Sequence, residues 1–82
     1  MADFHLQALN EAGQGNWQKS HDMVENFDDA FSCLIHGFLH RQEGDMPNAR
    51  YWYNRAGQSM PNNSLDDEFV RIYELVSAED GL

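Results

Sequence analysis

The stretch LIHGFLHRQEGDMPNARYWYNRAGQSMP, residues 34–61, decides the fold of this chain. It predicts a helix that ends at Gly44, a tight turn, and a second helix that begins after Asp45 and ends at Gly57. Pro47 suits the first turn of the second helix, where its missing backbone N–H would be unpaired in any case. Two helices joined by so short a turn are expected to lie antiparallel, as a helical hairpin.

The rest of the chain predicts further helices around this hairpin. Helical spacing and end signals indicate helices at about residues 2–12, 17–26, 28–43, 46–56 and 64–78. Asn16 is expected to cap the second of them and Ser64 the last, whereas the alternation that a strand needs never lasts four residues. The predicted fold is a single all-α domain of five short helices. It consists of two antiparallel helical hairpins (residues 1–29 and 30–63), a C-terminal capping helix (64–78) and a frayed tail (79–82).

The third helix is expected at the centre of this domain. At 100° per residue, Phe31, Leu34, Ile35 and Phe38 fall on one face, and small residues around Gly37 fall on the other. A helix with two such faces is covered on both sides, so the large residues are expected mainly in the core. The small face permits close approach of the fourth helix, which predicts that Gly37→Leu severely destabilises the fold.

Small and aromatic residues recur through residues 30–63 at a characteristic spacing: Gly37, Gly44, Ala49, Tyr53, Ala56 and Pro61. This pattern resembles a tetratricopeptide repeat, and residues 1–29 resemble one weakly. Cys33 and His40 depart from the pattern where an aromatic residue is usual. The resemblance implies a helical scaffold that recognises a protein or peptide. The block over residues 36–57 also resembles one that recurs in a group of small microbial proteins, a likeness that implies no substrate.

The charge balance bears on the class of partner. There are 14 acidic residues against 5 basic ones, a net charge of −9 with histidines neutral. Such a surface repels phosphate backbones, so we expect no nucleic-acid partner. No apolar run approaches the length of a bilayer span, and the N-terminal residues lack the features of a secretory signal. The expectation is a cytoplasmic protein without a membrane partner.

These features favour a small interaction module that binds a protein or peptide, or pairs with itself, and has no catalytic residues. The predicted partner-binding residues are Arg41, Arg50, Tyr51 and Arg55. The three arginines are most of the positive charge on an acidic chain and would suit an acidic ligand or a C-terminal carboxylate. The alternative that they only balance neighbouring acids stays open.

A second class of function rests on one face of the third helix. Cys33, His36, His40 and Glu43 follow one another at steps of three, four and three, which suits a metal site with Cys33, His36 and His40 as ligands, or a histidine-based enzyme. One helix alone rarely closes a tetrahedral site, and His21 is the obvious donor from elsewhere. Because Cys33 and His40 also fit packing positions, we expect no cofactor, and a protein that folds without metal.

Overall fold

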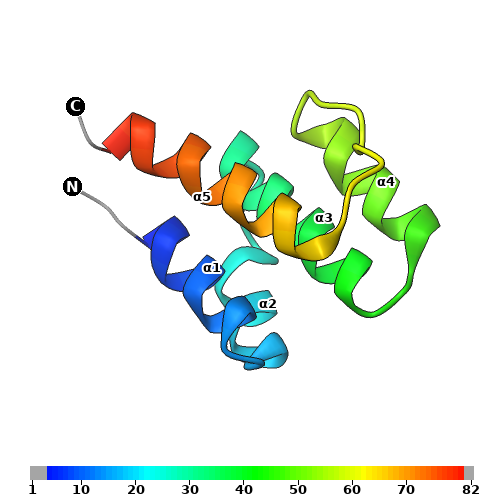
Figure 1. Cartoon of the computed structure of the whole chain (residues 1–82). Helices are drawn as coiled ribbons and strands as arrows, with labels where there is room; N and C mark the ends of the chain where they lie inside the picture. The colour runs from blue at the N-terminus through cyan, green and yellow to red at the C-terminus, as the bar shows by residue number, and fades with distance from the viewer. Residues whose placement is uncertain (1–3, 81–82) are drawn as a thin grey trace.

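The computed structural model describes residues 4–80, and within that range the chain forms helices and no strand, which confirms the all-α class. The helices are α1 (Phe4–Gly13), α2 (Trp17–Val24), α3 (Ala30–Gln42), α4 (Met46–Arg55) and α5 (Leu65–Asp80) (Figure 1). Three bounds differ from the predicted ones by two residues: α2 ends at Val24 and not at residue 26, α3 begins at Ala30 and not at residue 28, and α5 continues to Asp80, beyond the predicted end at residue 78. Residues 1–3 and 81–82, where the first predicted helix begins and the predicted tail ends, lie outside the described residues.

Polar side chains fix the starts of three helices. Side-chain oxygens of Asp29, Asp45 and Ser64 each accept a hydrogen bond from the backbone N–H three residues further on. Each bond satisfies one of the N–H groups that a helix leaves unpaired at its start. Asn16 stands at the corresponding position before α2, but its side-chain amide donates to Glu11 at 2.8 Å. Asn16 therefore supports the α1–α2 turn, and the predicted side-chain cap is not made there.

Two glycine turns of the same construction fold the chain into its hairpins. Gly15 has φ +85° and Gly44 has φ +83°, a backbone conformation that glycine adopts at little cost. In each turn the residue after the glycine donates its backbone N–H to the carbonyl of the residue five positions before it. These bonds, from Asn16 to Glu11 and from Asp45 to His40, are both 2.9 Å long. The chain reverses at both turns, so α1 packs on α2 and α3 on α4.

The α3 helix lies at the centre of the domain, as predicted, and its residues 32–41 are all buried. The other four helices pack against it, with α1 and α2 on one side and α4 on the other (Figure 1). Gly37 is the point of closest approach to α4, because a Cβ there would lie 2.7 Å from the Tyr53 ring and 3.2 Å from the Ala49 carbonyl oxygen. The small face of α3 therefore meets α4 as the sequence indicated.

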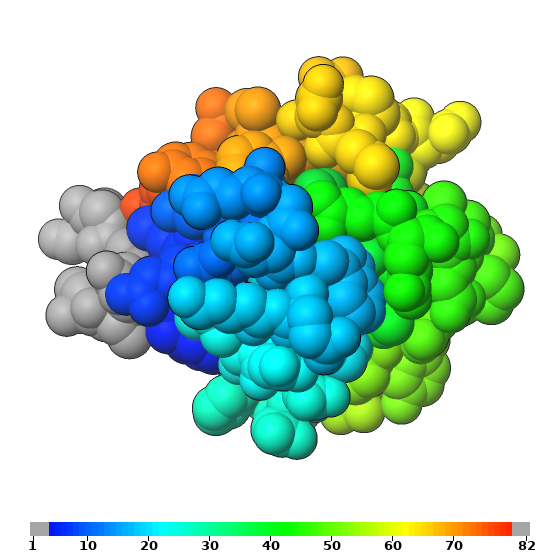
Figure 2. Space-filling view, turned by 90° about the horizontal axis from the view of Figure 1, so that it is seen from below, coloured from blue at the N-terminus to red at the C-terminus, as the bar shows by residue number. Residues whose placement is uncertain are grey.

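The α5 helix packs against α3 of the second hairpin, as predicted. It also packs against α1, which was not predicted, and so closes a core that both hairpins share. The fully buried core side chains include Leu9, Val24, Leu34, Ile35, Leu39, Tyr53, Ile72 and Val76. Seen from below, α1 and α2 form one face of the molecule, with the α3–α4 turn beside α2 (Figure 2).

A buried carboxylate secures α5 to the rest of the domain. Glu68 is fully buried and accepts hydrogen bonds from the Tyr53 hydroxyl at 2.6 Å, the Asn63 amide at 2.9 Å, and Arg71 at 2.8 and 2.9 Å. Burial alone would raise the pKa of this carboxyl, but the bonds from Arg71, Asn63 and Tyr53 outweigh it and lower the pKa below its ordinary value. Glu68 therefore stays ionised and joins α5, the preceding loop and α4.

Candidate functional site

A cluster of three histidines lies between α2 and α3. His36 and His40 stand one turn apart on α3, and His21 reaches them from α2, so that one ring nitrogen of each lies within 4.8 Å of the other two. The ring centroids of His21 and His36 are 4.7 Å apart, and those of His36 and His40 are 5.0 Å apart. The histidines of α3 are buried and His21 is half-buried. The fold thus brings His21, the additional donor that the sequence suggested, next to the His36–His40 pair of α3.

Two tryptophans bracket this histidine cluster. Trp52 of α4 stacks on His36 with ring centroids 3.9 Å apart, and Trp17 of α2 stacks on His21 at 4.8 Å. The Trp17 indole N–H also donates to the Leu39 carbonyl at 2.7 Å, which ties α2 to α3. Stacking on both outer sides restricts the rotation of the imidazole rings.

The three histidines have different hydrogen-bond partners. Burial lowers the pKa of His36 to about 4, with neighbouring His21 and His40 adding to the effect, so His36 is neutral at pH 7. Among the described residues, Nδ1 of His36 and Nδ1 of His21 are buried without a hydrogen-bond partner. His40 is held firmly, since its Nδ1 lies 2.6 Å from Oε2 of Glu43.

Cys33 does not join this cluster. The sequence grouped it with His36 and His40 as a metal ligand, but within residues 4–80 it belongs to none of the groups of side chains that could share an ion. Its thiol is fully buried, and burial raises its pKa, which disfavours the thiolate that binds metal. The third member of the cluster is therefore His21, and the prediction of Cys33 as a ligand is wrong.

The predicted partner-binding residues occupy two different environments. Arg41 is buried, and its guanidinium donates to the side chain and backbone carbonyl of Asn63, so it holds the loop before α5. Arg50, Tyr51 and Arg55 are exposed on α4. Arg55 donates to the Tyr51 hydroxyl at 3.2 Å, and its guanidinium lies 5.2 Å from the Trp52 ring centroid. The structure therefore separates Arg41 from the three exposed residues, whose role as a binding surface stays a prediction.

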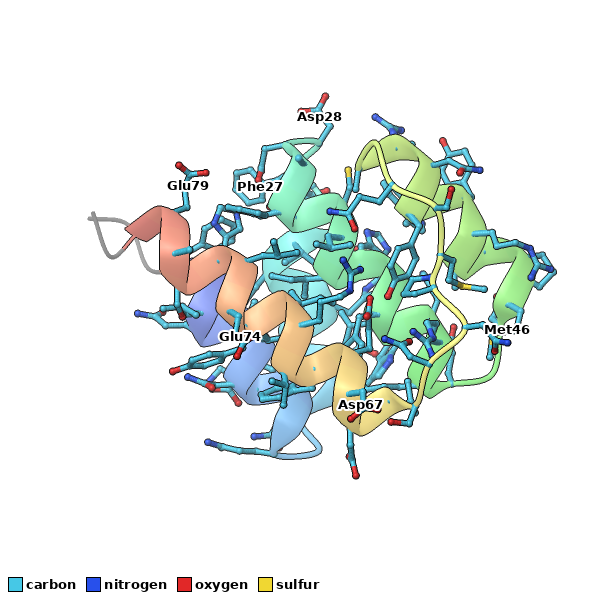
Figure 3. The ribbon with its side chains drawn as sticks, turned by 45° about the horizontal axis from the view of Figure 1, so that its top comes forward. Phe27, Asp28, Met46, Asp67, Glu74 and Glu79 are labelled. Atoms are coloured by element: carbon cyan, nitrogen blue, oxygen red, sulfur yellow. The ribbon has the colours of Figure 1, made fainter. Side chains whose placement is uncertain are left out.

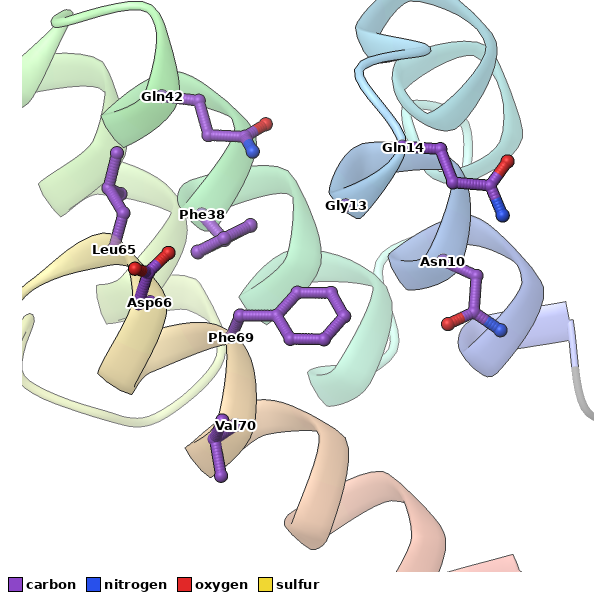
Figure 4. Close-up of a pocket in the computed structure, with 9 residues that line it drawn as sticks. All are labelled: Asn10, Gly13, Gln14, Phe38, Gln42, Leu65, Asp66, Phe69 and Val70. Atoms are coloured by element: carbon purple, nitrogen blue, oxygen red, sulfur yellow. The ribbon is translucent and has the colours of Figure 1, made fainter.

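A groove between α1 and α5 was not foreseen from the sequence. It has a volume of about 510 Å³, within the range of ordinary ligand pockets. Its lining residues are Asn10, Gly13, Gln14, Phe38, Gln42, Leu65, Asp66, Phe69 and Val70. Figure 4 shows the Phe69 ring projecting from α5 toward α1, with Asn10 and Gln14 opposite. Gly13 makes room for this ring, because a Cβ there would lie 2.9 Å from it.

The apolar surface continues along α5 beyond the groove. An adjoining hollow of about 380 Å³ is lined by Phe69, Val70, Tyr73 and Glu74. Val70 is 52% exposed and Tyr73 is 39% exposed, and together with Phe69 they form one continuous apolar surface. We call the groove and this hollow together the α5 groove. The signal that could have revealed it is Val70, which lies off the core-facing stripe of its helix.

Carboxylates lie along the α5 side of the α5 groove, and uncharged polar side chains such as Asn10 and Gln14 line the opposite side. Asp66 and Glu74 line the groove, and Asp67, Glu74 and Glu79 point outward from the same helix (Figure 3). None of the described lining residues is lysine or arginine. The nearest arginine on the helix, Arg71, is engaged by Glu68 and by the side chain of Gln58. The surface around the groove is therefore negative.

Comparisons with protein-family models, curated proteins and solved structures found no match for this chain. The resemblance to a tetratricopeptide repeat rests on its own residues alone. No helix in the described range is long and apolar enough to cross a membrane.

Proposed function

We propose that this protein is a small interaction module, without catalytic activity of its own, that binds a basic amphipathic helix in the α5 groove. The observation that carries the proposal is the apolar surface of Phe69, Val70 and Tyr73, open to solvent between polar rims. Helix-in-groove recognition uses this arrangement, in which apolar side chains of the ligand enter the groove and its polar face meets the rim.

Charge favours a basic ligand. The protein carries a net charge of −9, and the charged residues that line the α5 groove, Asp66 and Glu74, are both acidic. Lysines or arginines on the polar face of a ligand helix would meet these carboxylates, which speeds association and selects against acidic partners. The same charge disfavours a second copy of this chain, since each copy would bring a surface of the same sign.

The test is binding of a synthetic helical peptide of leucine and lysine, followed by fluorescence anisotropy of a label on the peptide. Val70→Lys removes an exposed apolar contact and adds a positive charge in the groove. We expect it to weaken binding at least about fourfold, because Val70 is 52% exposed and burial of that half of the side chain is worth about 0.8 kcal/mol or more. Repulsion between the new lysine and the lysines of the peptide adds to this loss.

Leu75→Lys is the matched control. Leu75 lies on α5 and is 38% exposed, but it lines neither part of the α5 groove. Its substitution makes the same change in net charge, so we expect binding within about twofold of the unmodified protein. Equal weakening by both variants would contradict the proposal. A control peptide has the same composition, but its leucines are scattered around the helix. Equal binding of this peptide would also contradict the proposal, because it would show attraction by charge alone.

A further inference from the structure

The histidine cluster between α2 and α3 presents a feature that packing does not explain. Polar groups in a protein interior are nearly always hydrogen-bonded, and an exception needs a physical reason. Here Nδ1 of His21 and Nδ1 of His36 both lack a hydrogen-bond partner among the described residues, although the Glu25 carboxylate lies 3.6 Å from Nδ1 of His21, in a cluster where one ring nitrogen of each histidine lies within 4.8 Å of the others. A single cation bound by all three histidines would give the unpaired ring nitrogens of His21 and His36 a partner.

The surroundings of His40 resemble the support that metal-binding histidines receive. Its Nδ1 lies 2.6 Å from the Glu43 carboxylate, so Nδ1 donates to that carboxylate, and in the neutral ring Nε2 is the atom with a lone pair for a metal ion. The Asn48 amide nitrogen lies 3.4 Å from Nε2, which fits an acceptor at that atom. A ligating histidine usually donates its other N–H to a carboxylate in this way, which fixes the ring and raises its basicity.

We propose that His21, His36 and His40 bind a divalent transition-metal ion of the zinc class. Three imidazoles suit zinc, cobalt, nickel and copper, and a three-histidine set leaves a fourth position for water or another ligand. Zinc–nitrogen bonds of 2.0–2.1 Å place tetrahedral ligand atoms about 3.3 Å apart, whereas the ring nitrogens here lie within 4.8 Å of one another, so they must close in by up to about 1.5 Å. His21 is the least buried of the three rings, and a small shift of α2 would move it together with the Trp17 ring that stacks on it, while stacking on Trp52 holds His36 in place.

This site lies apart from the α5 groove, and the proposal does not depend on the function of the groove. Glu43 and Glu25 supply negative charge nearby, since Glu25 lies 3.6 Å from Nδ1 of His21. The two tryptophans of the chain both stack on histidines of the cluster, which gives a built-in reporter.

The experiment is titration of untagged, chelator-treated protein with Co²⁺, followed by visible absorption and by tryptophan fluorescence. We expect one equivalent to bind, with the intense visible absorption of a four- or five-coordinate cobalt ion and with quenching of the fluorescence. His21→Gln should weaken binding at least tenfold. His5→Gln is the matched control, because His5 is the one histidine outside the cluster and pairs with Asp29 at 2.8 Å. It should leave binding unchanged.

Glu43→Ala provides a second test that spares the ligands. Glu43 is exposed, so its removal should leave the helical circular dichroism intact, and loss of such a supporting carboxylate typically weakens metal binding 10–100-fold. This variant decides the matter if His21→Gln loses helicity. The proposal would be overturned by absence of stoichiometric binding, by equal weakening in His5→Gln, or by unchanged affinity in a folded His21→Gln. If His21→Gln does not fold, unchanged affinity in Glu43→Ala would overturn it.

Discussion

Tyr53→Phe removes the hydroxyl that donates a hydrogen bond to Glu68, and we expect this loss to destabilise the domain. The hydroxyl donates to the buried carboxylate at 2.6 Å, and both side chains are fully buried. A hydrogen bond to a charged group contributes about 1.5–3 kcal/mol, and that is the expected loss in the free energy of unfolding. For a domain of this size each kcal/mol lowers the Tm by about 4–8 °C, so the Tm should fall by about 6 °C or more.

Glu68→Gln should cost more than Tyr53→Phe. Each oxygen of the Glu68 carboxylate accepts two hydrogen bonds. Glutamine replaces one of these oxygens with an NH₂ group, which is itself a donor, so the two hydrogen bonds to that oxygen are lost. Two lost bonds at about 1.5–3 kcal/mol each give about 3–6 kcal/mol, a large part of the stability of a small domain.

The assay is urea unfolding at pH 7, followed by circular dichroism, for both single variants and the double variant. In the double variant the two losses should not add, because the residues share one bond. Tyr51→Phe is the control: Tyr51 is exposed and accepts from Arg55, so its change should stay within about 0.5 kcal/mol. A loss in Tyr53→Phe as small as that of the control would refute the claim that this network secures α5.

Three further predictions follow from other contacts. Gly37→Leu should destabilise the domain by about 1–3 kcal/mol or more in thermal melts, because even a Cβ would lie 2.7 Å from the Tyr53 ring. Ala78→Leu, on the exposed side of α5, is the control and should have little effect. In metal-free protein, the free energy of unfolding should decrease by up to about 3 kcal/mol as pH falls from 6.5 to about 4, since only the unfolded chain protonates His36 there. His36→Phe should remove this part and leave the smaller decrease, below about pH 5.5, that carboxylates with a lowered pKa such as Glu68 cause. A pH profile unchanged by the substitution would contradict the prediction. Charge reversal at Arg50 and Arg55 should not weaken binding of the leucine–lysine peptide, whereas loss of an acidic peptide in that variant would favour the predicted arginine surface instead.

The hairpins could be predicted because their signals are local. Gly44 and Asp45 determine the α3–α4 turn through backbone conformation and capping, which act over a few residues. The end of α5 was predicted too early, although Gly81 directly follows Asp80 in the sequence and is the usual kind of residue after a helix.

The position of α5 and the sites depend on contacts between segments far apart in the sequence. The spacing of His36 and His40 indicated a shared helix face, but whether His21 reached them depended on how α2 packs on α3. The α5 groove is formed where Phe69 lies over Gly13, a contact that no local pattern predicts. Arg41 resembled a surface residue in the sequence, and only the path of the loop at Asn63 explains its burial.

The central claim, that the α5 groove binds a basic amphipathic helix, is tested most directly by nuclear magnetic resonance. Isotope-labelled protein is titrated with the unlabelled leucine–lysine peptide, and the backbone amide shifts are followed. If the peptide binds in the α5 groove, the largest shift changes are expected at the amides of Gly13, Gln14, Phe69, Val70 and Tyr73, with little change at Arg50 and Arg55. Changes centred on α4, or spread over all acidic residues without a maximum at the groove, would contradict it.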